Sequence, residues 1–357
     1  MLCGATAAAG EAGPTQAPIS SGAGDDRPDV VIDASARKLA IESLVTRIDE
    51  YYPIPEVRKR LTTELRRRSK AGAYDRVTSA KEFRTRLTSE LRELSHDEHF
   101  NVEYFVRPRP FPEQEKEKES ADPNSSRELI AGVHNQGFDA LERLPGNVGY
   151  MRLRTFEEPG STGKVIAAAM DFLSRTDAMI IDLRYNKGGY GETGALLASY
   201  FLSEATELSE AKSKDGVKQK WSYTFVPGAK YLDKPVYVLM SKTTFSAPEA
   251  FAYDLQALKR VIVVGEVSRG GANPSVQVLL SDRFGAIIPW AVTRNPITNT
   301  SWDGKGVTPD IPATSDQALD VAHLAAARAI SAKHPNDSVT GEIEEIIHKL
   351  GGEGTKQ

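Results

Sequence analysis

The sequence predicts a small helical region followed along the chain by an α/β fold. From about residue 129 onward, short apolar runs alternate with runs of helical spacing, which is typical of an α/β core with a largely buried sheet. Before that, residues 34–94 have helical spacing almost throughout. The chain has 357 residues, of which 40% are hydrophobic, so it can bury a sizeable core.

Residues 1–33 have no periodic pattern and are rich in Ala, Gly, Ser and Pro, which predicts a disordered tail. The Ala-x-Ala character of this tail resembles the cleavage end of a secretory signal that lacks its basic and apolar regions. Export to the periplasm or the exterior is therefore favoured over a cytoplasmic location. The single cysteine, Cys3, excludes an internal disulfide and a cysteine-based metal site.

Residues 34–99 predict a bundle of three short amphipathic helices. Pro53 and Pro55 separate the first helix from the second, and a Ser or Thr cap at 78–79 precedes the third. The bundle ends in the polar cluster Ser95-His96-Asp97-Glu98-His99. The expected helices cover residues 36–52, 56–72 and 79–94.

Residues 100–128 predict one strand, Phe100 to Val106, and then a linker that is too rich in Pro and charge to pack. The α/β core is expected over 129–330, and an amphipathic helix with a tail over 331–357. We expect core strands at 148–153, 179–183, 236–240, 261–264 and 286–290. We expect helices at 163–173, 193–201, 246–258, 317–330 and 341–350.

Charge and hydropathy exclude two classes of partner. The chain has 45 Lys and Arg against 49 Asp and Glu, a formal net charge of −4, so there is no electrostatic case for nucleic acid. No apolar run approaches the roughly 20 residues that span a bilayer. We therefore expect no nucleic-acid partner and no membrane span, and the sequence makes no prediction of the oligomeric state.

Ser246 is the first candidate for chemistry. It follows an apolar strand and a polar turn and lies at the start of a helix, where free backbone N–H groups stabilise developing negative charge. A catalytic nucleophile is one interpretation. A helix cap is the other, because Ser246-Ala-Pro-Glu249 is an S-x-x-E capping box with Pro in the first turn.

A glycine turn, Gly188-Gly189, follows the strand at 179–183 and is the second candidate. Its N–H groups would suit a developing oxyanion in acyl transfer, and an ordinary Gly-Gly turn is the alternative. Gly189-x-Gly191-x-x-Gly194 also matches a dinucleotide motif. That site is not favoured, because the strand ends several residues too early and no strand-terminal acid follows about 20 residues later.

His96 and His99, with Asp97 and Glu98 between them, are the third candidate. A metal site needs a further ligand cluster, which the sequence lacks. A solvated helix end, or a general base for a serine, fits one imidazole beside a carboxylate. A fourth candidate, Asp303, lies among glycines in a turn-rich loop, where an Asx turn is the default interpretation.

Several motifs occur in a fixed order over about residues 38–325. They are Asn135-Gln-Gly-Phe138, Glu142 to Tyr150, Ile181 to Gly189, Ser246 to Tyr253, Val264-Gly-Glu266 and Gly306 to Ile311. Together they resemble the carboxyl-terminal-processing (tail-specific) serine protease family, in the branch of the tricorn core and the interphotoreceptor retinoid-binding protein. The family implies a crotonase-like core of repeated strand-strand-helix units, with an N-terminal three-helix domain against it.

Carried over by position, the resemblance implies that Ser246 is the nucleophile. It also implies an oxyanion hole made by the backbone N–H groups of Ala247 and of Gly188 or Gly189. Members with a Ser-Lys dyad keep a lysine after the Val-Gly-Glu strand, but no lysine occurs here between residues 259 and 305. Arg269 cannot take its place, because a guanidinium does not deprotonate in a protein.

The tricorn-like arrangement remains. It implies His99 as general base, because the Asp-x-His motif fits His99 better than His96, and Asp303 as orienting acid where the branch commonly has Glu. An imidazole base suits neutral pH. The arrangement implies no metal and no cofactor.

The predicted function is therefore that of a serine peptidase, which hydrolyses peptide bonds of a peptide or protein by a Ser-His-acid mechanism. The alternative is a non-catalytic module of the same fold that binds an apolar, retinoid-like or fatty-acid-like ligand. Retention of Ser246, His99 and a carboxylate favours the enzyme. The active site is expected at the junction of the helical and α/β regions.

Overall fold

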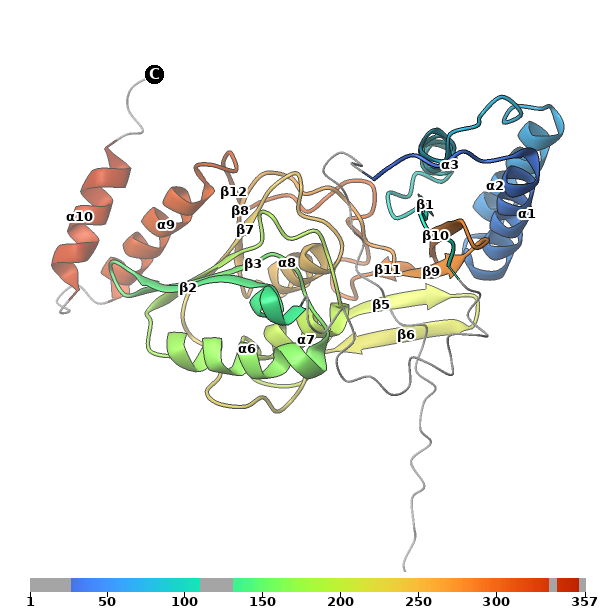
Figure 1. The fold of residues 1–357 in the computed structure, drawn as a ribbon. Coiled ribbons are helices and arrows are strands. Elements are labelled where there is room, and N and C mark those ends of the chain that lie inside the picture. The colour runs from blue at the N-terminus through green and yellow to red at the C-terminus, as the bar shows by residue number, and fades with distance from the viewer. Residues whose placement is uncertain (1–26, 110–130, 334–338, 353–357) are drawn as a thin grey trace, which may run out of the picture.

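The computed structural model describes residues 27–109, 131–333 and 339–352 (Figure 1). Most of the predicted disordered tail, the predicted linker from residue 110 to 128 and the last five residues lie outside the described residues. The described chain folds as a six-stranded sheet between helices, together with a smaller sheet covered by the N-terminal helices.

The N-terminal helices begin where local chemistry dictates. They are α1 (Ala34–Tyr51), α2 (Pro55–Lys70) and α3 (Ala80–Ser95). The Asp33 carboxylate accepts the Ala36 N–H, and the Ser79 hydroxyl accepts the Glu82 N–H at 3.0 Å. Helices α1 and α3 therefore each have a side-chain N-cap. Pro55 at the first position of α2 needs no hydrogen-bond acceptor.

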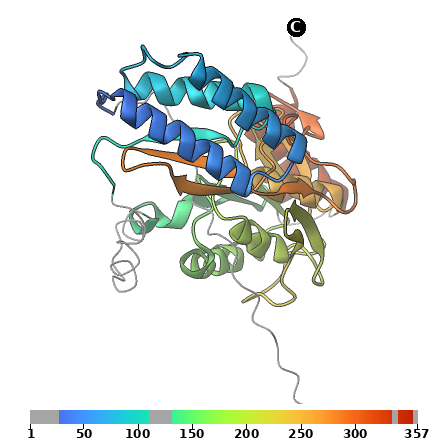
Figure 2. The ribbon, with the colours of Figure 1, turned by 90° about the vertical axis from the view of Figure 1, so that its right-hand side faces the viewer.

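These helices pack on a small antiparallel sheet in the order β1-β10-β9 (Figure 2). Its strands are β1 (Asn101–Tyr104), β9 (Ser275–Leu279) and β10 (Phe284–Pro289). Phe83 of α3 contacts Phe284 edge to face, with 5.4 Å between ring centroids. The helices therefore share one hydrophobic core with a hairpin from much later in the chain, and the predicted domain boundaries stay a prediction.

The large sheet has the order β12-β8-β7-β4-β3-β2 and is parallel except for the β2–β3 pair. Its strands are β2 (Phe138–Leu144), β3 (Val148–Leu153), β4 (Ala178–Asp182), β7 (Val236–Met240), β8 (Ile262–Gly265) and β12 (Ile311–Pro312). A 3-10 turn, η1 (Asn135–Gly137), precedes β2. The predicted α/β fold is confirmed, with a mixed sheet; β2 and β12 were not predicted.

Helices cover both faces of the large sheet (Figure 1). Met179 and Ile181 of β4 contact the core under α6, α7 and α8, whereas Ile180 between them contacts the core under α9 and α10. This alternation explains why β4 is apolar at nearly every position. The helices are α6 (Pro159–Leu173), α7 (Gly191–Ser199), α8 (Ala247–Ala257), α9 (Ala318–Lys333) and α10 (Thr340–Gly351).

A third antiparallel sheet, in the order β11-β5-β6, was not predicted. Its strands are β5 (Glu207–Ser213), β6 (Gly216–Trp221) and β11 (Val292–Arg294). Nearly every residue of β6 is exposed, so this strand lacks the apolar pattern that sequence reasoning relies on. Among the helices of the described ranges, none has the length and apolar character needed to cross a membrane.

Candidate active site

Ser246 lies where the chain turns from β7 into α8. As the N-cap of α8 it has φ 69° and ψ −119°, a positive φ that costs a non-glycine residue about 1–3 kcal/mol. Its backbone N–H donates to Glu249 Oε2 at 2.6 Å, as the S-x-x-E pattern predicts. The serine is therefore held at a strained turn at the N-terminus of a helix.

Glu249 does more than cap this helix. It is fully buried, and its carboxylate also accepts hydrogen bonds from Ser268 Oγ at 2.5 Å and from the Gly270 and Gly271 N–H groups at 2.7 and 2.9 Å. Burial raises the pKa of Glu249, and these four donors oppose that rise. Glu249 thus ties the turn at Ser246 to residues 268–271, a role that the sequence analysis missed.

His99 approaches Ser246 from the helical region. Its Nε2 is 3.3 Å from Ser246 Oγ, although 147 positions separate the two residues. The imidazole is 2% exposed and lies against the Phe245 ring, with 4.7 Å between centroids. His96 does not join this group: it is exposed and forms the left-handed C-cap of α3.

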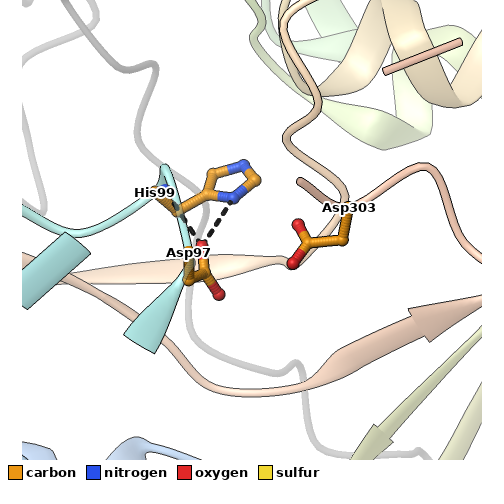
Figure 3. A group of neighbouring side chains, drawn as sticks. All are labelled: Asp97, His99 and Asp303. Atoms are coloured by element: carbon orange, nitrogen blue, oxygen red, sulfur yellow. Dashed lines mark hydrogen bonds and ion pairs between the residues drawn. The ribbon is translucent and has the colours of Figure 1, made fainter. Parts of the chain in front are cut away.

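Two carboxylates, rather than one, lie beside His99 (Figure 3). Asp97 Oδ1 is 3.4 Å from His99 Nδ1 and accepts the His99 backbone N–H at 2.9 Å. Asp303, the predicted acid, has a carboxylate oxygen within 4.8 Å of the Asp97 and His99 atoms. The Asn273 amide, also missed by sequence reasoning, donates to both carboxylates at 2.8 and 3.1 Å.

The two carboxyl groups have opposite pKa shifts. Burial acts to raise the pKa of Asp97, but the His99 side chain beside it, with hydrogen bonds from Asn273 and the His99 backbone N–H, outweighs burial, so this pKa is lowered. Burial, together with the negative charge of Asp97, raises the pKa of Asp303 to about 6. Asp97 is therefore the carboxylate that stays ionised beside the imidazole as the pH falls.

A cation would not fit this group as it stands. Asp97, His99 and Asp303 each offer a ligand atom, but Asn273 directs amide hydrogens at both carboxylates. An N–H donor cannot ligate a metal ion, so a cation would have to displace it.

The predicted glycine turn lies next to Ser246. A Cβ on Gly188 would be 3.4 Å from Ser246 Cβ, and the Phe245 N–H donates to the Asn186 carbonyl at 3.2 Å. The Gly188 N–H donates to Asn186 Oδ1 at 3.0 Å, whereas within the described ranges the Gly189 N–H has no acceptor. Of the two, the Gly188 N–H is therefore the one that is already engaged in a hydrogen bond.

Comparison with known proteins agrees with this geometry. Residues 34–134 match the model of the N-terminal domain of peptidase S41 in eukaryotic IRBP, and residues 147–313 match the model of peptidase family S41. The chain belongs to peptidase family S41. The predicted family is confirmed.

The curated relatives of this S41 chain are longer than the segments that match. It is 32% identical over 180 residues to carboxyl-terminal-processing peptidase 2, chloroplastic, of Arabidopsis thaliana. The matched segment covers 48% of this chain and 34% of the relative. It is 28% identical over 208 residues to the carboxyl-terminal-processing protease of Synechocystis sp., which covers 57% of this chain and 47% of the relative. The chain thus spans less than half the length of these relatives.

Solved structures show the same fold. The photosystem II D1 C-terminal processing protease has a TM-score of 0.50 and 16% identity, and the match covers 79% of this chain and 94% of that chain. A lipoprotein from Streptococcus agalactiae has a TM-score of 0.54 and 13% identity, with 84% and 99% covered.

The S41 chain has a cavity of about 630 Å³ beside Ser246. All three tryptophans of the chain, Trp221, Trp290 and Trp302, contribute to its lining. Residues of β5 and β6, the unpredicted hairpin, form another part of the wall. A partly apolar cavity that reaches Ser246 can hold a side chain of a bound ligand next to the serine hydroxyl.

Proposed function

We propose that this S41 protein is a serine peptidase that acts on peptide or protein substrates. The observation that carries the proposal is the line of contacts from Ser246 Oγ to His99 Nε2 at 3.3 Å and from His99 Nδ1 to Asp97 at 3.4 Å. A hydroxyl, an imidazole and a carboxylate in this order form the arrangement that activates serine for acyl transfer.

In the proposed mechanism, Ser246 Oγ attacks the scissile carbonyl carbon while His99 Nε2 takes the hydroxyl proton. Asp97 faces Nδ1, where it holds the ring and stabilises the imidazolium. His99 then gives the proton to the leaving amine, which leaves an acyl group on Ser246. Water, deprotonated by His99, attacks this ester and releases the second product.

The tetrahedral oxyanion of each step needs N–H donors. Ala247 lies in the first turn of α8, where backbone N–H groups have no partner within the helix. We assign it together with Gly189 as the oxyanion hole, since the Gly188 N–H is already engaged by Asn186. Asp303 is assigned as a second carboxylate that acts with Asp97, rather than as the single orienting acid.

We also propose the finer fold assignment, a crotonase-like core of repeated strand-strand-helix units with an N-terminal three-helix domain. Two features support it: parallel strands of the large sheet are joined through α6 and α8, and α1 to α3 precede the first strand of the described chain. The non-catalytic alternative is not favoured, because a module without chemistry does not need Ser246, His99 and a buried carboxylate in contact.

A fluorophosphonate probe tests the proposal directly, since it labels only a serine that is activated as a nucleophile. We expect wild-type protein to be labelled at Ser246, as mapped by peptide mass spectrometry, and the S246A variant to lose the label. S203A, which changes an exposed serine, is the matched control and should label at the wild-type rate. Absence of labelling in folded wild-type protein, or labelling at another residue, would reject the assignment.

A further inference from the structure

Two acids lie close together beside His99, of which Asp97 is buried and Asp303 is half-buried. Asp97 is 2% exposed, and its carboxylate and that of Asp303 lie within 4.8 Å of each other. Two carboxylates this close in a poorly solvated place cannot both ionise freely, because each charge disfavours the other. Unless something offsets the repulsion, one of them binds a proton.

The Asn273 side chain lies between these two acids. Its Nδ2 donates to Asp97 Oδ2 at 2.8 Å and to Asp303 Oδ2 at 3.1 Å. Its Oδ1 accepts the Thr293 backbone N–H at 3.1 Å, so the amide cannot be turned the other way without setting donor against donor. Asn273 itself is 5% exposed.

The amide is suited to this place by its chemistry. It has two hydrogens on one nitrogen, one for each carboxylate, and it adds no charge of its own. An aspartate here would add a third negative charge, and an apolar residue would supply no donor. The oxygen of the same amide accepts the backbone N–H of Thr293, the middle residue of β11, so the amide is held in place by this strand.

We propose that Asn273 is a positioning residue that keeps Asp97 and Asp303 ionised together beside His99, so that two carboxylates stabilise the imidazolium formed in catalysis. The inference rests on the proposed serine-peptidase function for its catalytic part. Its electrostatic part concerns the two carboxylates alone. Asn273 acts through them and does not touch the reacting atoms.

Other charged groups also act on this pair. Glu249 acts to raise the pKa of Asp303, and the Ala272 N–H and His99 act to lower it. Tyr52 and Arg92 also interact electrostatically with this pair: Tyr52 with both acids and Arg92 with Asp97. These groups remain in an Asn273 variant, so a change in titration there reports the lost amide.

The first experiment measures the titration midpoint of the Asp303 carboxyl group and needs no assay of activity. Protein labelled with ¹³C at aspartate Cγ is titrated by NMR, with the Asp303 signal assigned from its loss in D303N. In N273A we expect the Asp303 midpoint to move from about 6 to about 7, the size of one lost charge-assisted hydrogen bond. A midpoint that does not move would overturn the inference.

The second experiment measures the rate of fluorophosphonate labelling against pH. The acidic limb should move upward in N273A, with labelling at pH 6 reduced about fivefold as the ionised fraction of Asp303 falls. In a D303N background the repulsion is already absent, so adding N273A should change the rate much less. If N273A alone folds poorly, the double variant is compared with D303N instead, and a large loss of labelling there would contradict the inference.

The matched control is N295A. Asn295 is buried and donates to a buried carboxylate, Asp254, at 2.9 Å, but it does not touch the Asp97 and Asp303 pair. Its loss should leave the acidic limb in place. If N273A lowers labelling equally at all pH values, Asn273 has only a structural role. If wild-type protein is not labelled at all, the peptidase proposal fails, and the NMR midpoint still decides the electrostatic part.

Discussion

Glu249 provides the most demanding test of how the site is held together. Its two oxygens accept four hydrogen bonds from Ser246, Ser268, Gly270 and Gly271. A glutamine has the same shape but one oxygen, so in E249Q two of these donors would face an amide NH₂ group. Each lost bond to a buried charged acceptor costs about 1.5–3 kcal/mol, which gives about 3–6 kcal/mol in all.

A loss of this size is a large part of the about 5–15 kcal/mol that holds a typical domain folded. Urea unfolding followed by circular dichroism would measure it, with E266Q as the control. Glu266 is half-buried and accepts a single bond from the Lys242 N–H at 3.4 Å, so its variant should lose less than about 0.5 kcal/mol. A loss below about 1 kcal/mol in E249Q would refute the view that Glu249 anchors the turn at Ser246.

Two further predictions concern titratable groups. H99A should slow fluorophosphonate labelling by about 10⁴-fold because Ser246 Oγ loses its base, whereas H96A, at an exposed helix cap, should change it less than about threefold; comparable rates would contradict the choice of His99. Burial raises the pKa of Asp254 to about 7 from 3.8, so the folded state binds the extra proton, and the free energy of unfolding should fall by about 3 kcal/mol as the pH rises from 4 to 7. D254N should remove that slope in urea unfolding at pH 4.5 and 8, and an unchanged slope would assign it elsewhere.

The elements that could be predicted from the sequence are those that begin at a local signal, such as a helix cap, and those whose side chains are almost all buried. The Ser79 cap placed the start of α3 correctly, and β3 has the predicted bounds because its apolar run is buried on both faces of the sheet. Strand β6 was missed, since its residues are almost all exposed and it is held by pairing with β5. Backbone pairing with β5, its neighbour in the chain, leaves no apolar pattern in β6 itself.

The same distinction applies to the site. Ser246 and His99 could be proposed because each lies in a motif that is specific by its order in the chain. Asp97 was visible only as a neighbour of His99, and Asn273 had no signal, because its function depends on two acids that reach it from segments far apart in the chain. Asp303 was proposed as the single acid, and the arrangement of two carboxylates follows only from the fold.

The small sheet explains how residues so far apart can form one site. β1 begins two residues after His99 and pairs with β10, with Asn101 opposite Ile287. β10 pairs in turn with β9, which begins two residues after Asn273. His99 and Asn273 therefore lie next to strands of the same small sheet. Ser246, in contrast, follows β7 of the large sheet. A slip of one residue in the β1–β10 register would turn Val102 away from the helical core and displace His99 from Ser246 by about 3.3 Å. Burial of the β1 side chains under α1 to α3 thus fixes the distance on which the proposed chemistry depends.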